Sequence, residues 1–222
     1  MIANALPLEA AFPTPITVGT GFASLDFLNS IATFEGGAID WITDGESLLN
    51  WLRIMDLVDG TTSRFLRKTW LRQDFDTVAS EARTLREWFR KFLVKHRGIP
   101  LKAEAFSELA SLNDLLALDG AYFAIRSRAS RRIKSASKRR EHSPFEVAVQ
   151  REWRSPMSLL LPLAEDMARL VTSGEMSRVG VCEKSSCGMF YLAKSNRATA
   201  NRNRCPFCRI SRRQVRSNQS AS

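Results

Sequence analysis

All four cysteines of this 222-residue chain lie in its last fifth, in the pattern C-x4-C, 17 further residues, then C-x2-C. Two close cysteine pairs joined by a short spacer suit one tetrahedral zinc ion, because each tight turn supplies two thiolates. A site with four thiolates has no open position for catalysis, so we predict a structural zinc. The predicted ligands are Cys182, Cys187, Cys205 and Cys208.

Two other uses of these cysteines are two disulfides or four unrelated thiols. The chain begins without the positive and apolar segments of an export signal, so we expect a cytoplasmic protein, where disulfides are rare. Unrelated thiols would not cluster in this way. Zinc would also fold a segment that holds too few large apolar side chains to form a core alone.

The sequence around the cysteines predicts a small zinc-binding fold. Arg178–Val181 and Met189–Leu192 read as two short strands, so the first cysteine pair flanks a knuckle in a β-hairpin. Cys205-Pro206 favours a helix start, and 209–219 continues without Gly or Pro. Knuckle, hairpin and ligand-bearing helix together predict a treble-clef-like finger.

The charge of the chain is divided unevenly along its length. The net charge is +10, but residues 1–125 hold 12 Lys/Arg and 16 Asp/Glu, whereas residues 126–222 hold 21 and 7. Such asymmetry predicts a polyanionic partner for the C-terminal part. A composition of 44% hydrophobic and 25% charged residues is typical of a globular protein. The longest apolar run, about 159–164, contains Pro162 and is too short to cross a membrane.

Basic side chains surround the second cysteine pair. Four arginines recur at spacings of three and four, which places them on one face of the predicted helix, where guanidinium groups suit phosphate or guanine edges. The alternative is a solvated basic tail without a partner. The predicted nucleic-acid contacts are Arg209, Arg212, Arg213 and Arg216 on the helix, with Lys194, Arg197, Arg202 and Arg204 in the spacer.

A second basic segment, 126–140, contains eight Lys/Arg and no acid. It either orders on phosphate as a second nucleic-acid arm or is a solvated connector. We expect it to join the two strands of a hairpin, Ala121–Ser127 and Phe145–Trp153.

The rest of the N-terminal part is predicted to be mainly helical. Asp44 can cap a helix that carries a Leu/Trp stripe up to Met55, and apolar residues from Phe75 to Phe92 recur at helical spacing. Further helices are expected over Lys102–Leu116 and from Ser155-Pro156 towards Gly174. The predicted fold class is therefore α+β: a mainly helical N-terminal domain with a small β-hairpin, residues 1–175, and the finger, residues 176–222.

Two passages resemble a known family of bacterial proteins. Gly21-Phe-Ala-Ser-Leu-Asp-Phe-Leu-Asn-Ser30, followed by a Leu/Trp-rich segment at 44–57, is similar to the ABATE domain, and 178–216 resembles the CGNR-type zinc finger that follows it. The chain reads Cys208-Arg-Ile-Ser211 where the family has Cys-Gly-Asn-Arg. The resemblance implies a stress-induced transcription regulator that binds DNA.

We therefore expect a DNA-binding regulator rather than an enzyme. Two histidines, His96 and His142, each in a basic setting that we expect to be exposed, offer little for catalysis, and no Walker, H-E-x-x-H or G-x-S-x-G motif is present. Asp26 and Asn29 either form a polar ligand site for a small-molecule effector or brace the first helix through its backbone. The first alternative is an RNA-binding or ribosome-associated protein, with Phe190, Tyr191 and Phe207 stacking bases or packing the finger. The second is a small-molecule-binding protein or an enzyme with a basic localising tail. The sequence leaves the oligomeric state open.

Overall fold

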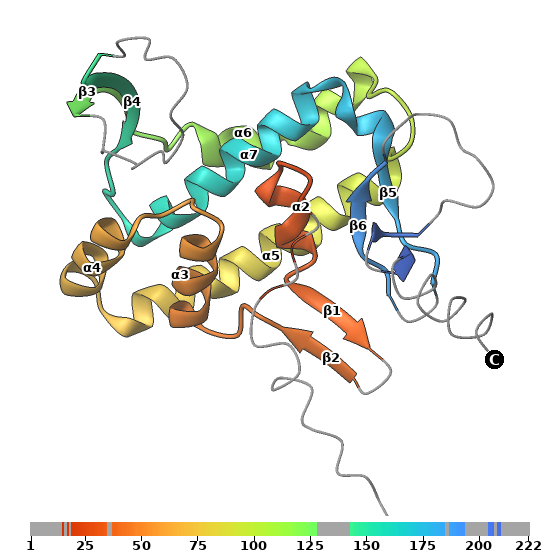
Figure 1. Ribbon diagram of the computed structural model, residues 1–222, viewed down its shortest axis with the longest axis horizontal. Coiled ribbons are helices and arrows are strands. Elements are labelled where there is room, and N and C mark those ends of the chain that lie inside the picture. Colours follow the sequence, from red (N-terminus) through yellow and green to blue (C-terminus); the bar gives the residue numbers. More distant parts are fainter. Residues whose placement is uncertain are drawn as a thin grey trace, which may run out of the picture.

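The computed structural model describes residues 15, 17, 19–34, 37–127, 143–184, 187–193, 204–206 and 208–209. In this part of the chain the fold is mainly helical and carries three separate two-stranded antiparallel sheets (Figure 1). This confirms the predicted α+β class with a mainly helical body.

The α-helices are α2 (Ala23–Leu28), α3 (Gly45–Ile54), α4 (Gly60–Thr69), α5 (Arg72–His96), α6 (Ala110–Leu116) and α7 (Leu161–Thr172). The 3-10 helices are η1 (Ala103–Leu109), η2 (Pro156–Leu160) and η3 (Gly174–Arg178). The hairpins are β1 (Ile31–Phe34) with β2 (Gly37–Asp40), β3 (Ala121–Ser127) with β4 (Phe145–Arg151), and β5 (Val179–Val181) with β6 (Phe190–Leu192).

The predicted caps and stripes form the helices that they indicated. Asp44 accepts the Ser47 N–H at 2.8 Å and the Ser47 hydroxyl accepts the Asp44 N–H at 2.9 Å, so α3 starts at a reciprocal cap. Pro162 lies in the first turn of α7, where its missing N–H costs no helical hydrogen bond.

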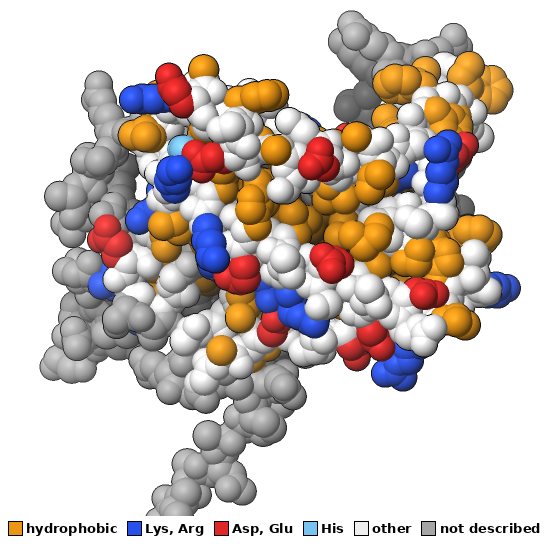
Figure 2. All heavy atoms as spheres, turned by 180° about the vertical axis from the view of Figure 1, so that it is seen from behind, with side chains coloured by type: hydrophobic (Ala, Val, Ile, Leu, Met, Phe, Trp, Pro, Cys, Tyr) orange, Lys and Arg blue, Asp and Glu red, His pale blue; other side chains and the backbone are white. Residues whose placement is uncertain are grey.

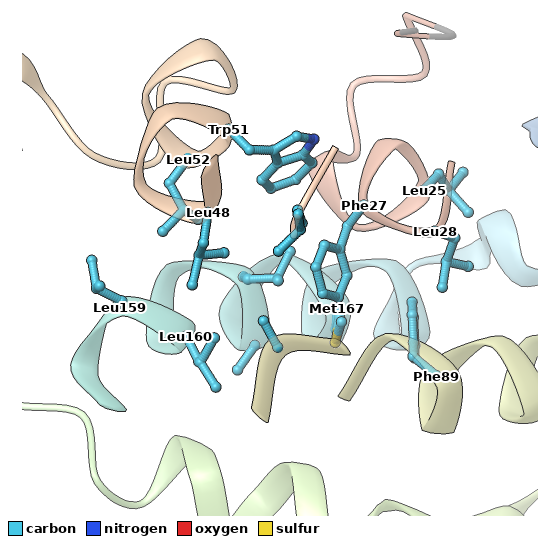
Figure 3. Packing of buried hydrophobic residues seen from close by; sticks show 14 of the residues in the cluster. Leu25, Phe27, Leu28, Leu48, Trp51, Leu52, Phe89, Leu159, Leu160 and Met167 are labelled. Atoms are coloured by element: carbon cyan, nitrogen blue, oxygen red, sulfur yellow. The ribbon is translucent and has the colours of Figure 1, made fainter. Parts of the chain in front are cut away.

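The core lies where α2, α3, α5 and α7 meet (Figure 3). Trp51 of α3 and Phe27 of α2 are buried with their ring centroids 5.5 Å apart, and Phe89 of α5 and Met167 of α7 close the other side. Burying these large apolar side chains is the main force that holds the helices together.

Some elements differ from the prediction or were not predicted. The expected helix Lys102–Leu116 is divided into η1 and α6, and β4 ends at Arg151, two residues before the expected Trp153. The hairpin β1–β2 and helix α4 were missed. Both bury few apolar side chains, Ala32 and Ile39 in the hairpin and Leu66 in α4, so neither has a strong hydrophobic pattern.

Buried polar contacts fix the short elements to the long helices. The Asp166 carboxylate of α7 accepts the Ser24 N–H at 2.7 Å and so supplies an acceptor at the start of α2. Arg86 of α5 donates to the Ser30 hydroxyl at 2.8 Å and forms an ion pair with Asp40 of β2. Within the described ranges, no helix combines the length and the hydropathy required to cross a bilayer.

Candidate metal centre

The four cysteines predicted from the sequence meet at one point. Their Sγ atoms all lie within 4.8 Å of one another, and the Cys187 and Cys205 sulfurs are 3.7 Å apart. No pair forms a disulfide, and three of the four residues are buried. The prediction that these cysteines form one cluster is therefore confirmed.

The first pair lies on the turn between β5 and β6. The Cys182 N–H donates to the Met189 carbonyl at 2.9 Å, and the Cys187 N–H donates to Lys184 at 2.9 Å. Gly188, which follows Cys187, has φ +60°, a conformation that side-chain-bearing residues seldom adopt. This tight turn brings two sulfurs to the same side, as the predicted knuckle requires.

The second pair lies at the beginning of a helical turn. Pro206, Cys208 and Arg209 are helical, and the Arg209 N–H donates to the Cys205 carbonyl at 3.2 Å. The Cys208 N–H also points at the Cys205 sulfur, 3.4 Å away. The predicted helix start is therefore present, while residues 210–219 of the expected helix lie outside the described part of the chain.

This arrangement fits a tetrahedral metal ion. An ion bonded to four sulfurs at about 2.3 Å sets them about 3.8 Å apart. The separation of 3.7 Å between Cys187 and Cys205, and the upper limit of 4.8 Å for all pairs, leave only a small contraction for binding. Four soft sulfur donors, with no oxygen or nitrogen ligand beside them among the described residues, favour a thiophilic ion.

The pKa values of the thiols indicate how much negative charge the cluster tolerates without a cation. A hydrogen bond from the Cys187 thiol lowers the pKa of Cys205 to about 5, and the same hydrogen bond, aided by burial, raises the pKa of Cys187. Burial raises the pKa of Cys208 to about 11. One thiolate therefore forms readily, but further negative charge is resisted until a metal ion compensates it.

Strand β6 connects this cluster to the helical body. Phe190 is 1% exposed and belongs to the main core, whereas the next residue, Tyr191, is buried against the cysteines. Alternate strand residues point to opposite faces, so one strand serves both clusters. Opposite Tyr191 stands Gly180, whose missing Cβ would lie 2.7 Å from the Tyr191 ring, so the ring needs a glycine there.

Asn29 and Arg90 hold β6 in place. The Asn29 amide donates to the Phe190 carbonyl at 2.9 Å and accepts the Phe190 N–H at 2.8 Å, so it pairs with this strand as another strand would. The Arg90 guanidinium lies over the Phe190 ring, 5.3 Å from its centroid, while also donating to the Leu28 carbonyl. Of the two roles considered for Asn29, a ligand site and a brace of the first helix, a brace is nearer to the structure, but the backbone that its side chain contacts lies 161 residues away.

The chain was compared with models of known protein families. Residues 21–174 match ABATE, described as "Putative stress-induced transcription regulator". The chain belongs to the ABATE family. The match ends before Cys182, so the cysteine cluster follows the ABATE region directly. No curated protein matches the chain.

The cationic residues predicted to contact nucleic acid are placed only in part. Arg209 is half-buried, with its guanidinium 5.7 Å from the Tyr191 ring centroid, and Arg204 is partly exposed beside the cluster. Burial raises the pKa of Tyr191, and the charge of Arg209 opposes this rise. The other predicted contacts lie outside the described residues: Lys194, Arg197, Arg202, Arg212, Arg213 and Arg216.

The other candidate residues of this ABATE protein that the structure describes are wholly or largely buried. Asp26 is buried in α2. The expectation of an exposed His96 was wrong. Its ring packs on Phe92 with 4.7 Å between the ring centroids, and its Nε2 lies 3.2 Å from the Glu108 carboxylate. Phe190 and Tyr191 are buried, as packing requires, and so are not available to stack on bases. His142 and the Phe207 side chain lie outside the described residues.

Sequence reasoning missed Arg90 and the pairing of Asn29 with β6. A polar residue inside the apolar Leu-Asp-Phe-Leu-Asn run was the available signal for Asn29, since a buried amide must find hydrogen-bond partners. Nothing in the sequence pattern indicates that the partner is the backbone of Phe190.

Proposed function

We propose that this ABATE protein is a zinc-dependent, DNA-binding transcription regulator of the cytoplasm. One structural zinc ion would be held by Cys182, Cys187, Cys205 and Cys208, which become thiolates when the metal binds. The family description supports the regulatory role. The set of four sulfur ligands supports zinc, because closed sites made of four cysteines are typical of structural zinc.

The observation that carries the proposal is the position of the second cysteine pair. Cys205 and Cys208 lie against cysteines of the β5–β6 turn, so a bound metal would fix the start of the cationic segment to the body. Beyond Arg209, three further arginines recur on one predicted helix face, at Arg212, Arg213 and Arg216. We propose that these side chains, with the basic spacer before Cys205, bind DNA phosphates.

The helical body would then act as the sensing or interaction domain, with residues 1–175 as its predicted extent. Its first 125 residues hold 12 Lys/Arg against 16 Asp/Glu, which makes that part of the body a poor surface for DNA. The basic segment 126–140 belongs to the same predicted domain, and its residues 128–140 lie outside the described part of the chain. A small-molecule effector remains our proposal for its input. We propose no catalytic step for any part of the chain.

Salt dependence of DNA binding tests the electrostatic part of the proposal. Zinc-loaded full-length protein is titrated against labelled duplex DNA by fluorescence anisotropy across a range of about 50 to 300 mM salt. If four to eight phosphates are contacted, log affinity should fall against log salt with a slope of about −4 to −7. A flat response contradicts binding through phosphate.

Charge removal tests which surface binds. Arg212→Ala/Arg213→Ala should weaken binding to all sequences and reduce the salt slope by about 2, with zinc content unchanged. The matched control is Arg53→Ala/Lys68→Ala, which removes two exposed cations from the ends of α3 and α4 and should leave affinity unchanged. Equal losses in both variants would indicate a general charge effect.

Substitution of one predicted ligand tests the zinc assignment. Cys205→Ser should abolish stoichiometric zinc binding, measured by elemental analysis, and lower DNA affinity at least as much as loss of the arginines. Retention of one zinc per chain contradicts the four-thiolate assignment. Competition of duplex DNA against single-stranded RNA then distinguishes DNA from RNA as the partner.

A further inference from the structure

The hairpin β3–β4 projects from the helical body (Figure 1). One of its faces is apolar and largely exposed. In the antiparallel register, Phe123 stands opposite Val149 and Ile125 opposite Val147. Because side chains alternate between faces, these residues and Phe145 share one face. The exposed fractions are 80% for Phe123, 77% for Ile125, 68% for Val147, 58% for Phe145 and 52% for Val149.

The opposite face of this hairpin is more polar and, on its β4 side, more buried, although Tyr122 of β3 is 51% exposed there. It carries an ion pair between Arg126 and Glu146, with 2.9 Å between the Arg126 Nε and the Glu146 carboxylate, and its β4 residues are partly buried. The charge of Arg126 also contributes to a lowered pKa of Asp59 at the start of α4. The usual order, with the apolar face inward and the polar face outward, is therefore reversed.

An apolar face this exposed is expected to be buried by another protein surface. A two-stranded hairpin alone is marginally stable in water. Five side chains with these exposures offer an apolar patch on the order of 600 Å², at the upper end of the largest patches found on monomeric proteins. Figure 2 shows hydrophobic side chains gathered on this projecting part of the molecule.

We infer that this apolar face is buried by the same face of a second copy of this chain, so that two β3–β4 hairpins pack face to face in a two-fold dimer. If the same patch supplies both sides, the interface buries on the order of 1,200 Å², the lower end for a specific complex. The five side chains include no charged or hydrogen-bonding group that would select a different partner. Dimers of identical chains have the more apolar interfaces.

Charge sets the orientation of the two hairpins. Strand β3 runs directly into the basic segment 126–140, which holds eight Lys/Arg and no acid. A parallel arrangement would bring two such segments side by side. An antiparallel arrangement separates the two hairpin tips by the length of seven strand residues, about 23 Å, which exceeds the Debye length of about 8 Å at physiological salt.

The antiparallel arrangement also places the strand end that leads into the basic segment near the base of the partner hairpin. The charges at this base are mixed and paired: Asp119 and Glu165 contact Arg151, and Glu152 contacts Arg154. The inference stands on the hairpin alone and does not depend on DNA or zinc binding.

The mass of the zinc-loaded full-length chain in solution tests the dimer. Sedimentation equilibrium between about 1 and 100 µM should show conversion from 25.0 kDa to twice this mass, with a dissociation constant on the order of 10 µM. Higher salt should leave the dimer intact or strengthen it, in contrast to DNA binding, since apolar contacts form it. A protein that stays monomeric at the highest concentration overturns the inference.

Paired substitutions identify the face. Ile125→Lys/Val147→Lys places two charges opposite each other at the centre of the patch and should abolish the dimer. The matched control, Val94→Lys/Phe106→Lys, replaces two exposed apolar residues outside the hairpin and should leave the dimer intact. A dimer that resists the hairpin variant but not the control overturns the assigned face.

Because the lysine variant could also disrupt the hairpin itself, a milder variant separates loss of the dimer from loss of the hairpin. Val147→Thr/Val149→Thr keeps β-branched side chains of high strand propensity and should weaken the dimer about tenfold or more, with an unchanged circular dichroism spectrum. An unchanged dissociation constant contradicts the inference. Flotation of wild-type monomer with vesicles of anionic lipid would assign the face to a membrane surface instead and also overturn the dimer.

Discussion

The hairpins β5–β6 and β3–β4 share one topology but differ in what covers them. In β5–β6, three-residue strands are buried on both faces, one against the helical core and one against the cysteines. In β3–β4, seven-residue strands expose an apolar face. Strand length and hydrophobicity therefore do not decide which hairpin is part of the core.

Polar contacts explain the difference better than strand length does. The backbone of Phe190 is paired by the Asn29 amide, and its ring is covered by the Arg90 guanidinium. These contacts come from α5 and from the end of α2, so the hairpin that carries the first cysteine pair is fixed to the body by contacts that do not involve the cysteines. The β3–β4 hairpin is held mainly at its base, where Arg151 contacts Asp119 and Glu165.

The largest predicted difference is in the free energy of unfolding, between removal of an aromatic side chain from β6 and removal of one from β3. Phe190→Ala should lower the free energy of unfolding by about 3–5 kcal/mol, because it leaves a cavity in the main core. Phe123→Ala should change it by less than about 0.5 kcal/mol in the monomer, because the side chain is mostly exposed. Urea denaturation at about 1 µM protein, below the expected dimer range, measures both. Equal losses would contradict the comparison.

A second prediction removes the clamp on β6. Asn29→Ala should cost about 2–4 kcal/mol, because it leaves the Phe190 N–H and carbonyl buried without their amide partner. Zinc affinity should fall as well, because the first cysteine pair is carried by the same hairpin. Denaturation and competition with a chelator measure the two effects.

The control for this clamp is Asn113→Ala on α6, where the residue is exposed and a change within about 0.5 kcal/mol is expected. If Asn29→Ala lowered zinc affinity without lowering stability, or the reverse, the metal site and the body would not be connected through β6 as described.

A third prediction loosens the other hairpin. Arg151→Ala removes two hydrogen bonds to Asp119, at 2.8 and 2.7 Å, and one to Glu165, and should lower the opening free energy of β3–β4 by about 1–3 kcal/mol. Hydrogen exchange should accelerate in β3–β4 and stay unchanged in β5–β6. The matched control Arg154→Ala removes an exposed pair with Glu152 and should have little effect. Faster exchange in both hairpins would show that they open together.

The sequence predicted those elements whose signals are local. The Asp44 cap, the stripe of α5 and the cysteine spacing each determine their structure over a few turns, and each was confirmed. The burial of Phe190 in the helical core and its pairing with Asn29 depend on contacts 161 residues apart, which no periodicity encodes. The alternation of β4 predicted a strand correctly, but the alternating apolar face turned out to point outward.

The smallest predicted effect is a change in the pKa of Asp59, which reports how close Arg126 of β3 lies to the start of α4. Asp59 caps α4, and its pKa is lowered mainly by the Thr62 N–H and, to a smaller extent, by the charge of Arg126. A lowered pKa stabilises the folded state above the unfolded pKa of Asp, and this stabilisation is lost as pH falls through the folded pKa. Arg126→Gln should therefore move the pKa of Asp59 slightly back towards its ordinary value. Arg126→Lys, which keeps the charge, should not. Carboxyl titration by NMR measures this, and an unchanged pKa in Arg126→Gln would mean that the hairpin lies farther from α4, with its polar face as free as its apolar one.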